Sequence, residues 1–118
     1  MPRLMSVAFT EAAVRERRKT VTRRKGWAFL KPGDRLTLCR KVMGRKKGEP
    51  LVRIVDVEVV SVRREPLRTA NDPSELALEG CGHLSYREFW ERYFHPQGLT
   101  SADDVTRIEW RYLDEEAS

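Results

Sequence analysis

The sequence predicts an α+β domain in which mostly antiparallel strands form a small β-barrel, flanked by two main helices. Two observations lead to this fold class. Segments with the two-residue periodicity of strands recur along the chain, most regularly at residues 51–62 and 105–113. Helix-start signals are identified at Thr10 and at Ser85. The resulting order of strand, helix, several strands, helix and final strand is typical of a mixed α+β domain.

The N-terminal half begins with the apolar run 4–9 (LMSVAF), which predicts the first strand. Thr10 is expected to cap a helix in which the acidic residue comes early and the arginines come late. Residues 19–24 (KTVTRR) break the helical pattern. LKPGD at 30–34 predicts a turn, residues 35–42 a strand, and the glycine-bounded basic stretch 43–50 a hairpin connection.

The C-terminal half contains the most regular strand signal, residues 51–62, whose alternation slips at Val59–Val60 and therefore predicts a β-bulge. Ser85 and Glu88 have the spacing of a capping box. The helix that they open carries aromatic residues that we expect in the core rather than as a base-stacking platform: Phe89, Trp90, Tyr93 and Phe94. In the last strand, we expect one alternating set inside, Ile108, Trp110 and Tyr112, and the other outside, Arg107, Glu109 and Arg111.

At 118 residues the chain is long enough for one domain, expected at 1–113, followed by an acidic tail at 114–118 that is expected to fray. Two cysteines make no disulfide framework, and no segment resembles a signal peptide or a membrane span. We therefore expect a cytoplasmic protein with no membrane partner, present as a monomer or a weak dimer.

The formal net charge of +5 favours a polyanionic partner. Seven of the eleven residues 15–25 are basic, and a second basic cluster lies at 40–47. The two clusters form one phosphate-binding groove if the hairpin loop folds toward the first, and two separate solvated faces if it does not. The residues expected to bind nucleic acid are Arg15, Arg17, Arg18, Lys25, Arg45, Lys46 and Lys47.

Several kinds of chemistry have no support in the sequence. The spacing of Cys81, His83 and His95 matches no zinc site, and no phosphate-binding glycine loop is present, so neither a metal nor a cofactor is expected. A Cys81–His83 nucleophile pair would lack an orienting partner, and the glycines on both sides of Cys81 predict a turn.

The order of five segments, none of them distinctive alone, resembles the ASCH domains, which are relatives of the RNA-binding PUA fold. These segments span nearly the whole chain: RRKTVTRR (17–24), LKPGDRLTLCR (30–40), SVRREPL (61–67), EGCGHLSYREFW (79–90) and VTRIEWRYL (105–113). The resemblance implies a PUA-like small barrel. It also implies relatives that bind nucleic acid, some that act as ribonucleases, and some that occur in bacteriophages.

One small bacterial branch of that family is similar to this chain in size and hydrolyses the acyl group of N4-acetylcytidine-type nucleosides. The resemblance implies Lys19, Thr22 and Glu79 as catalytic residues, which composition alone does not single out. A threonine hydroxyl needs a base, and a lysine can be that base when burial and nearby cations lower its pKa. Arg24 matches a substrate-holding arginine, and Arg23 and Trp27 are also expected at the substrate.

Three functions therefore stay open: an acylcytidine amidohydrolase, a reader of RNA or DNA, and a metal-independent ribonuclease. The expected partner is a nucleoside or single-stranded RNA or DNA. Arg17 stands where the family usually has glycine, and residues 79–83 are glycine-rich, which favours a longer anionic ligand. In a regular strand Lys19 and Thr22 would face opposite sides, so a shared site requires a bend between them.

Overall fold

The computed structural model describes residues 2–114. Its strands form one five-stranded sheet in the order β1-β3-β4-β5-β2. The strands are β1 (Arg3–Ser6), β2 (Val21–Arg24), β3 (Arg35–Cys39), β4 (Arg53–Pro66) and β5 (Asp104–Tyr112). The α-helices are α1 (Glu11–Arg15), α2 (Pro73–Leu78) and α3 (Tyr86–Tyr93), with short 3₁₀ turns at Ala8–Thr10, Leu67–Ala70 and His95–Gln97.

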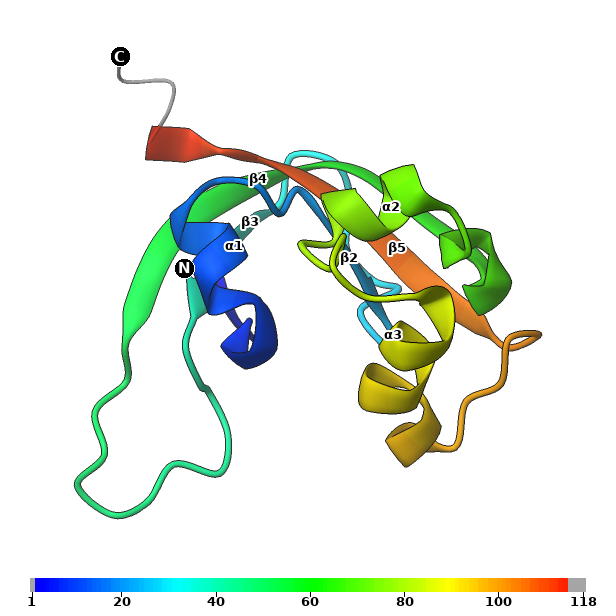
Figure 1. Cartoon of the computed structure of the whole chain (residues 1–118). Coiled ribbons are helices and arrows are strands. Elements are labelled where there is room, and N and C mark those ends of the chain that lie inside the picture. The colour runs from blue at the N-terminus through cyan, green and yellow to red at the C-terminus, as the bar shows by residue number, and fades with distance from the viewer. Residues whose placement is uncertain (1, 115–118) are drawn as a thin grey trace.

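The sheet is mixed, because β1 pairs with β3 in parallel whereas the other three strand pairs are antiparallel. It curls into an arch, and α1 and α3 lie beneath that arch (Figure 1). This half-barrel with helices against it confirms the predicted α+β class with mostly antiparallel strands.

The predicted β-bulge in β4 is confirmed. Val59 pairs with Trp110 and Ser61 pairs with Glu109, so the register shifts by one residue and Val60 is left over. Val57 and Val59 are buried, whereas Val60 is exposed. The extra residue allows β4 to keep its apolar side toward the core while the strand continues to Pro66.

The aromatic helix α3 packs in the core, as predicted. Phe89 and Phe94 are buried in a cluster with Leu76 of α2 and Val105 of β5. The capping box at its start is also confirmed, since the Ser85 hydroxyl accepts from the Glu88 N–H and the Glu88 carboxylate accepts from the Ser85 N–H, each at 3.1 Å. Both features are local in sequence, which is why they were predictable.

The predicted helix after Thr10 is present as α1, but the predicted Thr10 cap was wrong, and one helix was missed. Thr10 precedes α1, but its backbone angles, φ −124° and ψ 23°, are not those of an extended cap, and its side chain makes no capping bond. Helix α2 was not predicted at all. Its signal is Asp72 followed by Pro73, and the Asp72 carboxylate accepts from the Ser74 N–H at 2.9 Å.

Of the predicted tail at 114–118, only Asp114 is within the described residues. Its carboxylate accepts hydrogen bonds from the Arg17 Nε at 3.2 and 3.3 Å. Within residues 2–114, the helices are all too short or too polar to cross a bilayer.

Candidate active site

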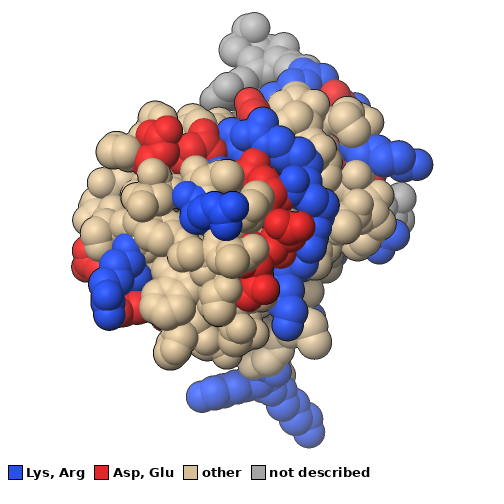
Figure 2. Space-filling view, turned by 90° about the vertical axis from the view of Figure 1, so that its right-hand side faces the viewer, with Lys and Arg blue, Asp and Glu red and all other residues tan. Residues whose placement is uncertain are grey.

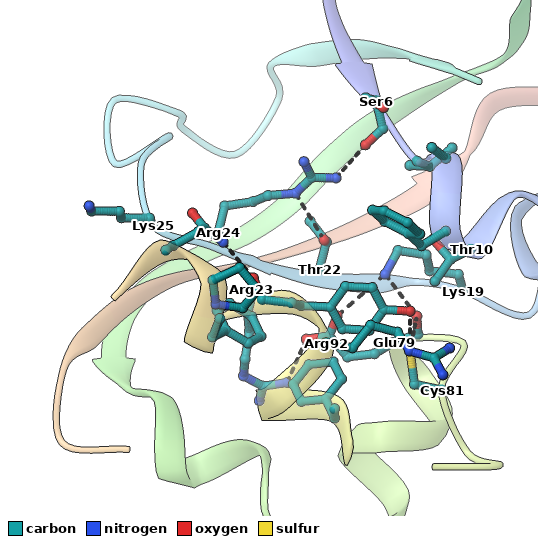
Figure 3. A pocket seen from close by; sticks show the side chains of 18 of the residues that line it. Ser6, Thr10, Lys19, Thr22, Arg23, Arg24, Lys25, Glu79, Cys81 and Arg92 are labelled. Carbon is teal, nitrogen blue, oxygen red and sulfur yellow. Dashed lines mark hydrogen bonds and ion pairs between the residues drawn. The ribbon is translucent and has the colours of Figure 1, made fainter. Parts of the chain in front are cut away.

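A pocket of about 600 Å³ opens between residues 6–10, strand β2, the end of α2 and helix α3 (Figure 3). Pockets of this size hold small molecules in many proteins. The pocket lining includes Lys25, which was predicted to bind nucleic acid, and all six residues that the sequence singled out for catalysis or substrate contact: Lys19, Thr22, Arg23, Arg24, Trp27 and Glu79.

Lys19 and Thr22 reach the same pocket because Lys19 is not part of a strand. Strand β2 begins only at Val21. Arg17, which precedes Lys19 in the chain, has a backbone with a positive φ of 62°. The Lys19 carbonyl is fixed by two donors from β5, the Trp110 Nε1 at 3.1 Å and the Tyr112 hydroxyl. Lys19 thus lies outside the regular strand, and both side chains line the pocket.

Lys19 and Glu79 form a buried pair. The Lys19 Nζ donates to the Glu79 carbonyl oxygen at 2.8 Å and to its carboxylate Oε1 at 3.3 Å, and Lys19 is only 3% exposed. Burial lowers the pKa of Lys19, the Glu79 charge opposes that effect, and the Arg24 charge adds to it. A lysine whose neutral form is favoured in this way is suited to accept a proton.

Gly80 permits this contact. It has a φ of 80°, and a Cβ at this position would lie 2.7 Å from the Ala13 Cβ and 3.4 Å from the Lys19 Cβ. The chain turns here, since the Gly80 N–H donates to Ala77 and the Cys81 N–H donates to Leu76. The turn predicted around Cys81 is thus confirmed, and its glycine lets the end of α2 approach α1 and Lys19 closely.

Thr22 and Arg24 form the second polar pair of the pocket. The buried Thr22 hydroxyl accepts from the Arg24 Nε at 3.2 Å, and the Arg24 Nη2 donates to the Ser6 carbonyl at 2.6 Å. Arg24 therefore connects β2 with β1, the two outer strands of the sheet. Burial lowers the pKa of Arg24, and no carboxylate of the described residues is in ion-pair range of it. Its remaining donors are available to a ligand.

Arg23 has a different environment. Its side chain is fully buried, and its three nitrogens contact the carboxylates of Glu65, Glu75 and Glu79. The contact with Glu79 joins Nη1 to Oε2 at 2.9 Å. The guanidinium predicted to hold substrate is thus engaged by the protein's own carboxylates.

Arg107 was predicted to face outward, and this was wrong. It is 5% exposed, and its Nε donates to the Glu75 Oε1 at 2.9 Å while its Nη1 donates to Glu109 at 3.2 Å. That Arg107 hydrogen bond is the main reason that the pKa of Glu75 falls to about 2. The cause of the error is α2, which carries Glu75 over this part of the sheet. Neither Glu65 nor Glu75 was singled out from the sequence.

The pocket also has an aromatic side, of which the sequence indicated only Trp27. Phe9 is 77% exposed at the pocket and meets the Tyr93 ring edge-on, with centroids 5.7 Å apart. Trp27 lines the pocket too, with an unusual positive φ of 68°, and its ring lies 5.6 Å from that of Phe29. Flat apolar surfaces beside polar groups are suited to a nucleobase.

Much of the first basic cluster is paired with carboxylates. Arg15 binds Glu11 at 2.8 Å, Arg18 binds Glu16 at 2.6 Å, and Arg17 binds Asp114. Lysine, arginine and acidic side chains also lie side by side on the face shown in Figure 2. This cluster is therefore less electropositive than the sequence suggests.

The second basic cluster begins at Arg40, which binds Glu11, the same carboxylate that binds Arg15, at 2.9 Å. Glu11 therefore links the two clusters, because it binds Arg15 of the first and Arg40 of the second. Beyond Arg40, the loop between β3 and β4 extends from the body of the protein (Figure 1). Arg45 contacts the Val42 carbonyl, whereas Lys46 and Lys47 are exposed and have no ion pair with the described acidic residues. No group of three or more His, Cys, Asp or Glu side chains within residues 2–114 is arranged to hold a metal.

No protein-family model matches the chain, and no curated protein matches it by sequence. Its similarity to solved structures is clear. An ASCH domain from Lactobacillus crispatus has a TM-score of 0.59 and 15% identity, over 93% of this chain and 79% of that one. Protein EF3133 from Enterococcus faecalis has a TM-score of 0.64 and 15% identity, over 100% and 82%.

A variant of ZmASCH from Zymomonas mobilis is also similar, with a TM-score of 0.53 and 14% identity over 92% of this chain and 67% of that one. Such low identities support a shared fold and carry no information about a shared substrate. The chain therefore has the fold of an ASCH domain, as the order of its sequence segments predicts.

Proposed function

We propose that this protein is an ASCH-type amidohydrolase that removes the acyl group from N4-acylcytidine-type nucleosides. The observation that carries the proposal is the content of one pocket. A buried Lys19–Glu79 pair and a Thr22 hydroxyl bonded to Arg24 line the same cavity of about 600 Å³. These are the parts that acyl transfer to a hydroxyl needs: a nucleophile, a base and a cation for developing negative charge.

In the proposed reaction the Thr22 oxygen attacks the amide carbonyl carbon, and its proton passes to the neutral Lys19 amine. The Arg24 guanidinium stabilises the negative charge that develops in the tetrahedral intermediate. The Lys19 ammonium, held by Glu79, returns the proton to the N4 atom as the carbon–nitrogen bond breaks. Water then hydrolyses the Thr22 ester and releases the carboxylic acid, which restores the hydroxyl.

A small substrate is favoured over a long polyanion by the ion pairs of the first basic cluster. Arg15, Arg17 and Arg18 are bound to carboxylates, and such pairs would have to break before these side chains contacted phosphates. The aromatic side of the pocket suits a single base. A hydrolase acting on a nucleoside accounts for both features.

The second candidate is a reader of single-stranded RNA or DNA that binds without turnover. It is favoured by the loop between β3 and β4, where Lys46 and Lys47 are exposed and have no ion pair within the described part of the chain. In this case the pocket would hold one base and the loop would contact the backbone.

One set of assays separates these functions. The protein is incubated with N4-acetylcytidine, single-stranded RNA and single-stranded DNA, and the products are resolved by liquid chromatography. We expect cytidine and acetate, with the rate reduced at least about a hundredfold in Lys19→Ala and Glu79→Ala. Salt-dependent oligonucleotide binding with no hydrolysis would contradict the proposal and support the reader, while RNA fragments would support a ribonuclease.

A further inference from the structure

The Glu79 carboxylate lies between two buried cations. Its Oε1 is 3.3 Å from the Lys19 Nζ, and its Oε2 is 2.9 Å from the Arg23 Nη1. The side chains of Lys19 and Glu79 are almost fully buried and that of Arg23 is entirely so. A carboxylate with a cationic group on each oxygen is fixed in orientation.

Arg23 is itself held from two further elements. Glu65, near the end of β4, contacts its Nε and Nη2 at 3.3 and 3.2 Å, and Glu75 of α2 contacts its Nη2. With carboxylates on all three nitrogens, the guanidinium is kept in place beside Glu79. The cost of burying its charge is offset by the same contacts.

We propose that Arg23 is a positioning residue, which holds the Glu79 carboxylate by its second oxygen and offsets its negative charge, and so limits how strongly Glu79 stabilises the ammonium form of Lys19. The catalytic meaning of this inference rests on the proposed function, in which Lys19 is the base. Without Arg23, the Glu79 charge acts on Lys19 alone and stabilises its ammonium form. A smaller fraction of the Lys19 amine is then neutral at a given pH.

The other groups that act on Lys19 are few. Arg24 of β2 and the Cys81 thiol, which follows α2, influence its charge, and the Trp110 ring of β5 lies 6.0 Å from its Nζ. Among the charged groups of the described chain, Glu79 alone forms an ion pair with Lys19. An effect of Arg23 on Lys19 is therefore expected to pass through Glu79.

The test is an NMR titration of the lysine side chain, which needs no substrate. The protein is labelled with carbon-13 lysine, and the Lys19 signal is assigned by its loss in Lys19→Met. We expect Arg23→Gln to raise the titration midpoint of Lys19 by about one pH unit, because one opposing cation is removed from its partner. Arg107→Gln is the matched control, since Arg107 binds Glu75 in the same network and does not bind Glu79, and it should leave the midpoint unchanged.

An unchanged midpoint in Arg23→Gln, or an equal shift in Arg107→Gln, would overturn the inference. In a Glu79→Gln background, Arg23→Gln should have no further effect, and a full shift there would also overturn it. If Arg23→Gln does not fold, Glu65→Gln replaces it. Removing this competing carboxylate should lower the midpoint, and a rise or no change would count against the inference. Absence of hydrolysis, by contrast, would refute only the proposed function.

Discussion

The Lys19 Nζ donates to two oxygens of one residue, the Glu79 carbonyl at 2.8 Å and the Glu79 carboxylate at 3.3 Å. The two residues are 60 positions apart in the sequence. Glu79 is presented by the end of α2, and Lys19 by the segment that enters β2. The pair therefore depends on the packing of α2 against the sheet as much as on its own chemistry.

The first prediction concerns pH. Because burial lowers the pKa of Lys19, the neutral amine forms at lower pH than for an exposed lysine. We expect kcat/KM for N4-acetylcytidine to rise as pH rises through this lowered pKa and then to level off. Lys19→Arg, which stays protonated, should be inactive throughout. A pH–rate profile that is flat, or that falls with rising pH over this range, would rule out Lys19 as the base.

The second prediction concerns the buried charge network. Glu75 binds both Arg23 and Arg107, so Glu75→Gln should lower the free energy of unfolding by about 3 kcal/mol at pH 7. The pKa of Glu75 is about 2 when folded, against an ordinary value of 4.5, so its stabilising effect is complete above the ordinary value and is lost as pH falls toward 2. Urea denaturation should therefore show the difference between wild type and variant narrowing below pH 4.5. A constant difference would contradict the prediction.

The third prediction concerns the turn after α2. Gly80→Ala places a methyl group 2.7 Å from the Ala13 Cβ at a positive φ, so we expect a loss of about 2 kcal/mol in stability and a reduced kcat through displacement of Glu79. Gly82 is the control, because its φ is not positive and a Cβ there comes no closer than 3.5 Å to Ala77. Equal effects of the two substitutions on thermal unfolding and on kcat would show that the turn has no special role.

The fourth prediction concerns nucleic acid. We expect single-stranded RNA to bind weakly, with Kd in the range of roughly 10–100 µM near physiological salt. The double variant Lys46→Ala/Lys47→Ala should reduce the salt dependence of binding more than Arg15→Ala/Arg18→Ala, because the two arginines are already paired with Glu11 and Glu16. Fluorescence anisotropy at several salt concentrations measures both slopes. A larger reduction of the salt dependence in Arg15→Ala/Arg18→Ala than in Lys46→Ala/Lys47→Ala would mean that the arginine ion pairs open on binding.

The details of secondary structure that the residue patterns predicted are local ones. The capping box at Ser85 and the bulge beside Val60 depend on residues that are neighbours in the chain, and both are confirmed. The overall fold was predicted because the order of segments resembles known ASCH domains. That same resemblance suggested Lys19 and Glu79 as residues of one site, which no spacing rule would have joined.

The burial of Arg107 could not be predicted, because it depends on α2. The alternation of β5 assigned Arg107 to the solvent side, but a helix absent from the prediction covers that side and supplies Glu75 as its partner. A charged residue in a strand is predicted to be exposed unless the element that covers it is known. The ion pair of Arg15 with Glu11 was visible in principle, since the two residues are four apart in a predicted helix, but the count of positive charges hid it.

The most direct test of the proposed function compares two threonines of the same short segment. Thr22 lines the pocket and contacts Arg24, whereas Thr20 is not part of the pocket lining. Release of cytidine from N4-acetylcytidine is measured for wild type, Thr22→Ala and Thr20→Ala. We predict that Thr22→Ala loses at least about a hundredfold in kcat, while Thr20→Ala stays near wild type. Equal rates in wild type and Thr22→Ala, or no release by the wild type, would contradict the proposal.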